Sequence, residues 1–276
     1  MRAPLMPYGW PIAMAPPLTL YFSGSMPSRS RQYTAWEANA SLSSHRSMSS
    51  TARPWRPVRR RHDVRRRRHG RSGPVRAVKA HPESDIRSVI ETWAVARDSG
   101  AWDELRSKWH PDGWMKTTWF RGPAAAFVEA SRGAFDAGVL VHHFLGGSLI
   151  HVSGRRAIAQ TKMSIAQRAV LGAVEVDVTC VGRFYDFFEE RDGDWRIVLR
   201  EPIYEKDRMD PVVPGQLPPL DHAALARLPS GCRHLLYCQE SAGMSTYTDV
   251  PGLRGNEVRD LYAEGDRWLA GEVLHR

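Results

Sequence analysis

The sequence predicts an α+β domain in which a few helices come first and a meander of long antiparallel strands follows. Early in this domain, apolar residues recur every three to four positions, which is the spacing of an amphipathic helix. From residue 139 to 204 apolar and polar residues alternate, and short Gly-containing turns separate the alternating segments. Helices and strands in that order are expected to pack as helices on one face of a curved sheet.

The helical part is expected to hold three helices and one strand. The first begins near Ser84, a residue type that caps helix N-termini, and ends at Gly100. Its apolar stripe follows the spacing i, i+3, i+4, i+7: Ile86, Val89, Ile90 and Trp93. A short second helix is expected over 102–109 and a third over 124–137, with a strand over 114–120 between them.

The sheet is expected to consist mainly of four long strands: 139–152, 157–170, 174–189 and 195–204. Three hairpin turns join them: Ser153-Gly154, Leu171-Gly172 and Asp192-Gly193. The pair Gly146-Gly147 falls inside the first of these strands and predicts a bulge, which is a usual means of curving a sheet.

The N-terminal segment 1–80 differs sharply in composition from the rest of the chain. It holds 16 Lys and Arg against two acids, so the remaining 196 of the 276 residues carry a net charge of −5 although the whole chain carries +9. The basic run 59–71 repels itself and cannot be buried, which predicts a disordered Arg-, Ser- and Pro-rich extension that the mature protein need not contain. A nucleic-acid-binding arm or a transit peptide is the alternative; no aromatic residue between the arginines could stack on bases, which argues against nucleic acid.

The C-terminal segment 211–276 begins with a proline-rich linker over 211–219. Helices are expected over 221–228 and 256–269, and we expect this extension to pack on the domain formed by 81–210. Three cysteines without paired or metal-binding spacing indicate free thiols in a reducing, cytoplasmic compartment. No apolar run reaches the roughly 18 residues of a membrane-spanning helix, so no membrane association is expected.

Three short strings, in order, resemble those of the SnoaL-like, or nuclear transport factor 2-like, superfamily. They are ARDSGAWDEL at 96–105, HHFLGG at 142–147 and RDGDWRI at 191–197. The resemblance implies a cone: a strongly curved antiparallel sheet around about three N-terminal helices, with a pocket on its concave side. It also implies a homodimer or homotrimer formed through the outer face of the sheet. Because the superfamily contains both enzymes and non-catalytic members, the fold alone does not decide the function.

The candidate site centres on Asp98 and a histidine. Asp98 extends the helical row Ile90, Ala94 and therefore ends an apolar stripe, although it could also face solvent or cap the next turn. Periodicity does not decide between His142 and His143, because each alternates with apolar neighbours on its own face of the strand. The resemblance selects His143 and implies that it acts as a base oriented by Asp98, with a hydrogen-bonded structural histidine as the alternative.

The resemblance further implies that Arg200 stabilises a leaving anion or a developing oxyanion, whereas an arginine paired on the sheet is the alternative. Trp93 stands where the dehydrochlorinase pattern has a pocket lysine, which argues against halide elimination and favours a flat or cyclic substrate. No phosphate loop, nucleophile elbow or metal motif is present, so we expect neither a cofactor nor a metal.

The expected function is therefore that of a cofactor-independent lyase, isomerase or cyclase that performs His-Asp acid-base chemistry on a small hydrophobic organic molecule. The alternative is a non-catalytic module of the same fold that binds a small molecule or a protein partner.

Overall fold

The structure is a computed structural model that describes residues 81–274. The extension expected over 1–80 and its basic run at 59–71 lie outside the described residues. The helices are α1 (Pro82–Ser99), α2 (Trp102–Ser107), α3 (Ala124–Asp136), α4 (His222–Arg227), α5 (Arg233–Ser241) and α6 (Asn256–Leu269). The strands are β1 (Trp109–Lys116), β2 (Arg121–Pro123), β3 (Val141–Ser153), β4 (Arg156–Leu171), β5 (Val174–Arg191) and β6 (Asp194–Pro211).

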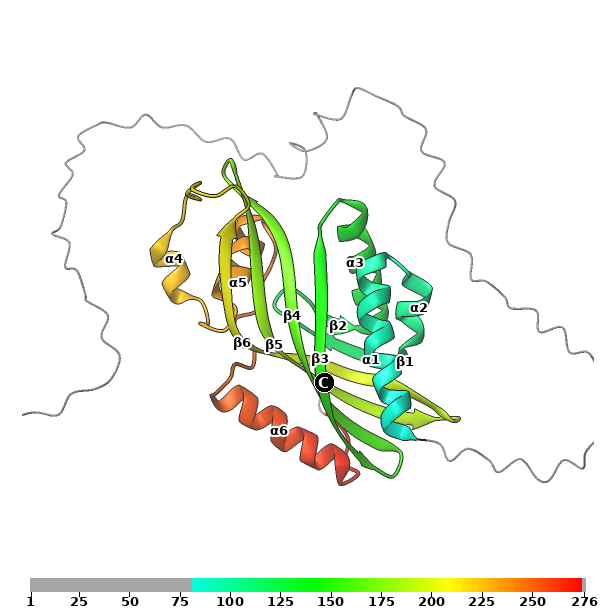
Figure 1. Ribbon diagram of the computed structural model, residues 1–276. Coiled ribbons are helices and arrows are strands. Elements are labelled where there is room, and N and C mark those ends of the chain that lie inside the picture. The colour runs from blue at the N-terminus through cyan, green and yellow to red at the C-terminus, as the bar shows by residue number, and fades with distance from the viewer. Residues whose placement is uncertain (1–80, 275–276) are drawn as a thin grey trace, which may run out of the picture. The chain divides into compact units, whose positions relative to one another are not determined.

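The described strands form one open, strongly curved sheet in the order β2-β1-β6-β5-β4-β3 (Figure 1). The long strands β3 to β6 are antiparallel neighbours joined by tight turns, as predicted. At the last hairpin, Asp192 and Gly193 both have positive φ, 55° and 86°, the conformation of the turn type that follows the twist of two paired strands. The fold is α+β, as the sequence predicted.

Local details around β1 differ from the prediction. The strand expected over 114–120 starts at Trp109 and stops at Lys116, so α2 ends earlier than expected. The strand stops because the Thr117 hydroxyl accepts hydrogen bonds from the backbone N–H groups of Trp119 (3.2 Å) and Phe120 (3.0 Å), which closes a tight turn. In addition, β1 runs parallel to β6, so the sheet is not wholly antiparallel.

Two further boundaries and one helix also differ from the prediction. Helix α1 begins at Pro82 without a side-chain cap at its N-terminus, because a proline is already suited to the first helical turn; Ser84 therefore lies inside the helix. Strand β6 continues to Pro211, beyond the predicted end at 204 and into the expected linker. Helix α5 was not predicted at all.

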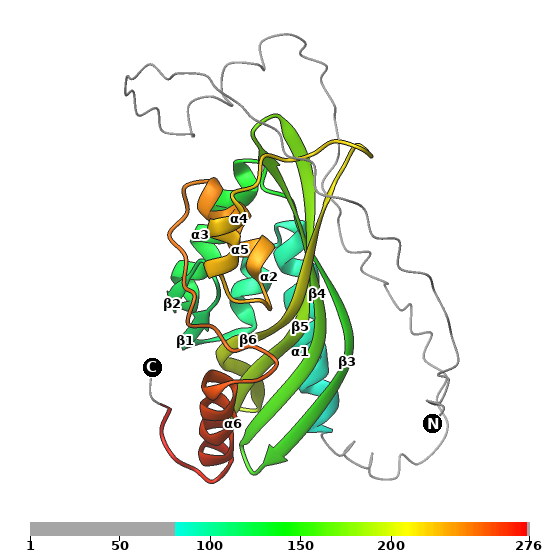
Figure 2. The same cartoon turned by 90° about the vertical axis from the view of Figure 1, so that its left-hand side faces the viewer.

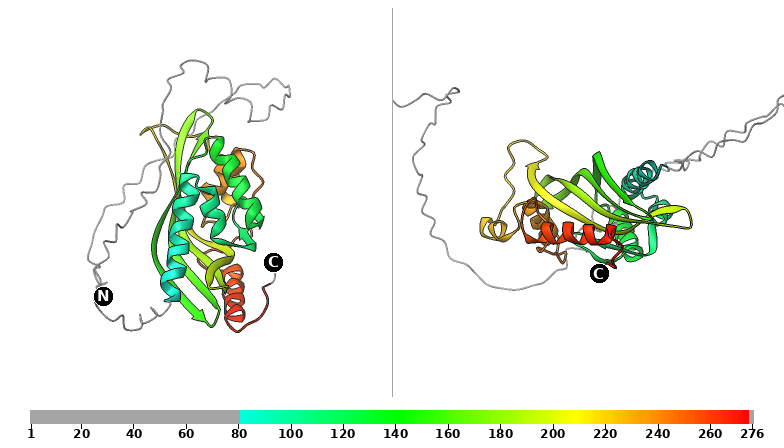
Figure 3. Two further views of the ribbon diagram at one scale, coloured as in Figure 1. Left: turned by 90° about the vertical axis from the view of Figure 1, so that its right-hand side faces the viewer. Right: turned by 90° about the horizontal axis from the view of Figure 1, so that it is seen from below.

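The core lies on both faces of the sheet. Phe184 packs with α1 on the concave face, whereas its chain neighbour Tyr185 packs with α6 on the opposite face, because successive strand residues point to opposite sides. Figure 3 shows α1 lying along the sheet, and Figure 2 shows α5 on the same side of the strands as α3. Helix α6 covers the lower end of the sheet in Figure 1, where the Trp268 indole N–H donates to the carbonyl of Phe188 (3.2 Å).

The three cysteines, which lie at positions 180, 232 and 238, are free and buried. Burial raises the pKa of the Cys232 and Cys238 thiols to about 12, so both are protonated at neutral pH. Among residues 81–274, no helix is long and apolar enough to cross a membrane.

Strand register is irregular at four points of the described sheet, and two of these coincide with glycines. One lies between Leu145 and Ser148, where the sequence predicted a bulge at Gly146-Gly147. The other lies between Val181 and Gly182, opposite β6. At Gly182 the strands approach so closely that an added Cβ would lie 2.0 Å from the carbonyl oxygen of Ile203. Backbone atoms cannot move aside as a flexible side chain can, so this position requires glycine.

We expect Gly182→Ala to lower the free energy of unfolding by about 1–3 kcal/mol, the usual cost of overpacking a core. Gly147→Ala is the matched control, because an added Cβ there meets nothing within 4 Å. Urea denaturation of the two variants provides the comparison. Equal stability of both variants would show that the close approach at Gly182 does not constrain the sheet.

Candidate functional site

Asp98 and His143 are joined by two hydrogen bonds. One carboxylate oxygen of Asp98 accepts from the backbone N–H of His143 (2.6 Å), and the other lies 2.6 Å from its ring Nδ1. Asp98 is in the last turn of α1, which ends at Gly100 in the left-handed conformation (φ 74°). His143 is on β3, the edge strand, whose outer backbone groups have no neighbouring strand. The carboxylate therefore takes the place of a strand partner.

This double contact determines the tautomer of the imidazole. The Asp98 carboxylate accepts a hydrogen bond from the Nδ1–H group, so in neutral His143 the other nitrogen, Nε2, carries the lone pair. His143 is buried between the rings of Trp93 (centroid distance 5.5 Å) and Phe184 (6.0 Å). Burial lowers the pKa of His143 below its ordinary value of 6.5, and the charges of Arg97 and Arg200 lower it further, while Asp98 opposes the shift. The ring is accordingly a neutral base at pH 7.

The adjacent His142 is on the other face of the strand. Its side chain is 71% exposed, against 7% for His143, and its Nδ1 lies 3.6 Å from Asp98. The structure thus places His143 in the interior, on the face that the family resemblance selected, and leaves His142 in solvent.

Arg200 is fully buried and forms a bidentate ion pair with Asp186 on the neighbouring strand, at 2.6 and 2.8 Å. Its guanidinium lies 4.1 Å from the ring centroid of Trp93 and 4.0 Å from that of Phe184. Burial raises the pKa of Asp186, and the contact with Arg200 opposes that rise. One terminal nitrogen of Arg200, Nη1, has no hydrogen-bond partner among the described residues.

A small cavity of about 50 Å³ lies beside His143. Aromatic side chains form much of its wall: Trp93, Trp119, Phe127, Phe184 and Tyr204. Arg97 of α1, together with Leu235 and Gln239 of α5, completes it. Since roughly 10–15 Å³ is needed for one water, the cavity has room for only a few water molecules. Asp98 and Arg200 are not among the residues that line it, although both contact residues that do.

Sequence reasoning did not identify Arg97, Asp186 or Gln239. Arg97 carried a signal, because it follows Trp93 by four residues and so continues the buried stripe of α1. Asp186 carried a weaker one, since it interrupts a run of buried apolar residues on β5. Gln239 carried none, because the helix that contains it was not predicted.

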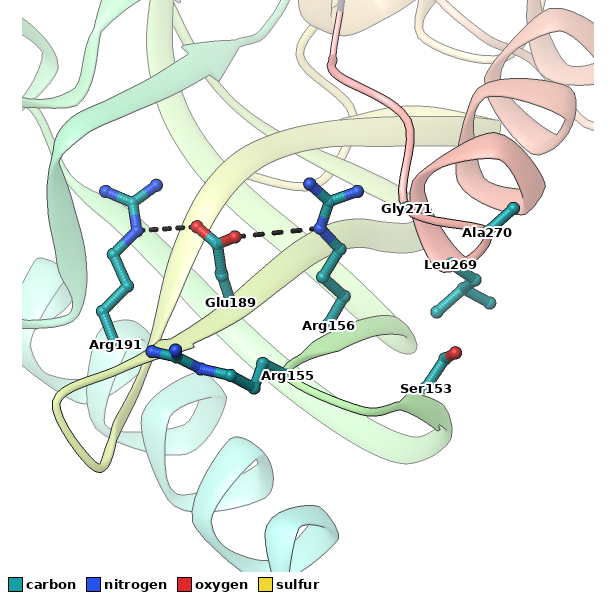
Figure 4. A pocket seen from close by; sticks show the side chains of 8 residues that line it. All are labelled: Ser153, Arg155, Arg156, Glu189, Arg191, Leu269, Ala270 and Gly271. Atoms are coloured by element: carbon teal, nitrogen blue, oxygen red, sulfur yellow. Dashed lines mark hydrogen bonds and ion pairs between the residues drawn. The ribbon is translucent and has the colours of Figure 1, made fainter.

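A larger hollow of about 560 Å³ lies elsewhere, between the β3–β4 turn and the end of α6 (Figure 4). It is lined by Ser153, Arg155, Arg156, Glu189, Arg191, Leu269, Ala270 and Gly271. Its three arginines already form ion pairs with acidic side chains, among them Glu189, which contacts both Arg156 and Arg191. Their charge is therefore largely balanced within the protein, and the smaller cavity beside His143 is the stronger candidate despite its size.

Within residues 81–274, no group of three or more His, Cys, Asp or Glu side chains is arranged to hold a metal ion.

Comparisons with known proteins identify the family to which the chain belongs. The model of the SnoaL-like domain matches residues 79–201. Pea pathogenicity protein 2 of the fungus Fusarium vanettenii is 37% identical over 200 residues, which cover 68% of this chain and 86% of that protein. A PEP2-like protein of the same fungus is 35% identical over 200 residues, with the same coverage. The chain belongs to the SnoaL-like family.

Among solved structures, a hexachlorocyclohexane dehydrochlorinase (LinA type 2) is 15% identical with a TM-score of 0.37, over 50% of this chain and 93% of that one. A likeness at this level carries no information about the reaction. The names of the two fungal relatives specify neither a reaction nor a substrate.

Removing Arg200 should destabilise the protein strongly. Arg200→Met leaves the Asp186 carboxylate buried without its partner, which typically costs about 3–5 kcal/mol of unfolding free energy. The double variant Asp186→Leu/Arg200→Met should recover much of that loss, because no uncompensated charge remains. The control is Arg208→Met, which breaks an exposed ion pair on the same strand and should cost at most about 1 kcal/mol. Chemical denaturation measures the free energy of unfolding of all three variants. If Arg200→Met lost as little stability as Arg208→Met, the buried Arg200–Asp186 pair would not stabilise the fold.

The stability of the protein should also depend on the protonation of His143. Its pKa is lowered in the folded state, so its contribution to stability is complete above pH 6.5 and decreases as the pH falls below that value, where the unfolded chain binds the proton first. Between pH 7 and pH 5, His143→Gln should therefore lose less stability than the wild type. His142→Gln should behave like the wild type. An identical pH dependence in all three proteins, followed by urea denaturation, would argue against a neutral buried His143.

Proposed function

We propose that this protein is a cofactor-independent lyase, isomerase or cyclase in which His143 acts as the general base and Asp98 orients it. The observation that supports this most directly is the pair of 2.6 Å hydrogen bonds that Asp98 accepts from the backbone N–H and the ring Nδ1 of His143, a buried, neutral histidine at the wall of a cavity. In this arrangement Nε2 takes a proton from a carbon next to a carbonyl group. The C–H electron pair then expels a leaving group from the adjacent carbon, or accepts a proton at another position.

The roles of the two residues follow from electrostatics. When Nε2 accepts the proton the ring becomes an imidazolium, and the adjacent carboxylate stabilises that charge while preventing the ring from turning. A buried Asp–His contact is not by itself a sign of catalysis, however. His234 makes the same two contacts with Asp207, at 2.6 Å through its backbone N–H and 2.9 Å through Nδ1, at the start of α5. His143 differs in that it is nearly fully buried and lines the cavity, whereas the side chain of His234 is 30% exposed.

A non-catalytic function is the second candidate, and the size of the cavity favours it. A volume of about 50 Å³ is well below the roughly 300–1,000 Å³ of typical ligand pockets. If the cavity never opens, the Asp98–His143 pair serves to anchor the edge strand, and the domain acts through its surface.

The test is proton exchange in D₂O, followed by NMR over a panel of cyclic ketones and β-hydroxy carbonyl compounds. With a compound that exchanges on the wild-type protein, His143→Ala should slow the reaction by about 10²–10⁴-fold, the usual contribution of a positioned general base. His142→Ala and His234→Ala are matched controls and should retain the wild-type rate. An exchange rate unaffected by His143→Ala would rule out its role as base and favour the non-catalytic module.

A further inference from the structure

Arg97 is a buried cation at the cavity that the proposed chemistry does not use. It lies in the last turn of α1, on the stripe that also carries Ile90 and Trp93. Its exposure is 6%, and it lines the cavity together with His143. The guanidinium carries a permanent positive charge and five N–H donors, so its position inside the protein requires an explanation.

Among residues 81–274, no side chain is a dedicated partner for this charge. No hydrogen bond or ion pair links the Arg97 guanidinium to any other residue within 81–274. The acid whose charge acts on it is Asp98, and both oxygens of Asp98 accept hydrogen bonds from His143. Arg200, by contrast, is paired with both oxygens of Asp186. A charge largely withdrawn from water without a paired carboxylate is poorly compensated, and a ligand anion at the cavity would compensate it.

The other residues that line the cavity indicate which further chemical groups such a ligand carries. Trp93, Phe127 and Phe184 present aromatic surfaces, which pack well against a flat ring. Gln239 is 3% exposed, and its side-chain oxygen has no hydrogen-bond partner among the described residues, so it is available to a hydroxyl or N–H donor.

We propose that Arg97 binds the anionic oxygen of the ligand and that the substrate class is a small ring-bearing organic acid. The inference rests on the proposed function in one respect only, namely that the ligand enters the cavity that contains His143. The present volume of about 50 Å³ accommodates the oxygens but not the ring. The cavity therefore has to enlarge when the ring enters.

The experiment compares benzoate with its neutral analogue benzamide on the full chain, by calorimetry and tryptophan fluorescence. The wild type should bind benzoate at least about tenfold more tightly, since hydrogen bonds to charged groups are stronger than neutral ones. Arg97→Met should remove that preference and weaken benzoate binding by about ten- to a hundredfold, whereas Arg97→Lys should retain part of it. Arg87→Met, on the same helix, is the matched control and should bind as the wild type does.

The stability of the unliganded variant separates this role from a structural one. A cation near the end of a helix can stabilise it through the helix dipole, and in that case Arg97→Met would melt several degrees lower than the wild type. If Arg97 is an uncompensated charge awaiting an anion, Arg97→Met should melt at the same or a higher temperature. A lower melting temperature, or equal binding of benzoate and benzamide by the wild type, would overturn the proposal.

The result can be distinguished from failure of the proposed function. In one outcome, benzoate binding depends on Arg97 while no proton exchange depends on His143. That outcome would refute only the catalytic role, and the protein would then be an acid-binding module. Proton exchange that depends on His143 but not on Arg97 would refute only the present inference.

Discussion

The carboxylate of Asp98 bridges the end of α1 and the backbone of the edge strand β3, and the remainder of the site is positioned from that contact. An edge strand has outward-facing N–H groups that need an acceptor, and Asp98 provides one at His143. The same carboxylate holds the ring Nδ1. Because Trp93 and Arg97 project from the same helix, fixing its end relative to the sheet also sets where these two side chains meet the cavity. The Asp98–His143 contact thus fixes α1 on the sheet and also places the side chains that line the cavity.

The charges around this contact are arranged in two different ways. Arg200 and Asp186 neutralise one another inside the protein, between two aromatic rings, and this pair supports the wall of the cavity. Arg97 and Asp98 are neighbours in the chain, but both oxygens of Asp98 are engaged with His143. Burial lowers the pKa of His143 most, and the charges of both arginines add to that shift. The Arg200–Asp186 pair therefore contributes to structure, whereas Arg97 is left for the anion that we propose it binds.

The C-terminal part of the chain decides how accessible that cavity is. Helix α5 lies beyond the SnoaL-like region 79–201 and contributes Leu235 and Gln239 to the cavity wall. Its first turn is held by Asp207 of β6, which accepts from the backbone N–H groups of His234 and Leu235 at 2.6 and 2.9 Å. Helix α5 therefore closes one side of the cavity from beyond the SnoaL-like region.

The sequence by itself was enough to determine the order of helices α1 to α3 and of the four long strands, the three hairpin turns and the glycine bulge, because each follows from local rules of periodicity and turn geometry. It could not choose between His142 and His143, since Phe144, on the same face as His142, is apolar but 67% exposed. It also missed the unpaired state of Arg97 and the presence of Gln239 in the cavity. These features depend on which distant segments pack together, and burial, ion pairing and pKa are properties of that packing rather than of neighbours in the chain. The tertiary structure alone decided them, because a charge is satisfied or left unsatisfied only by the groups that surround it in space.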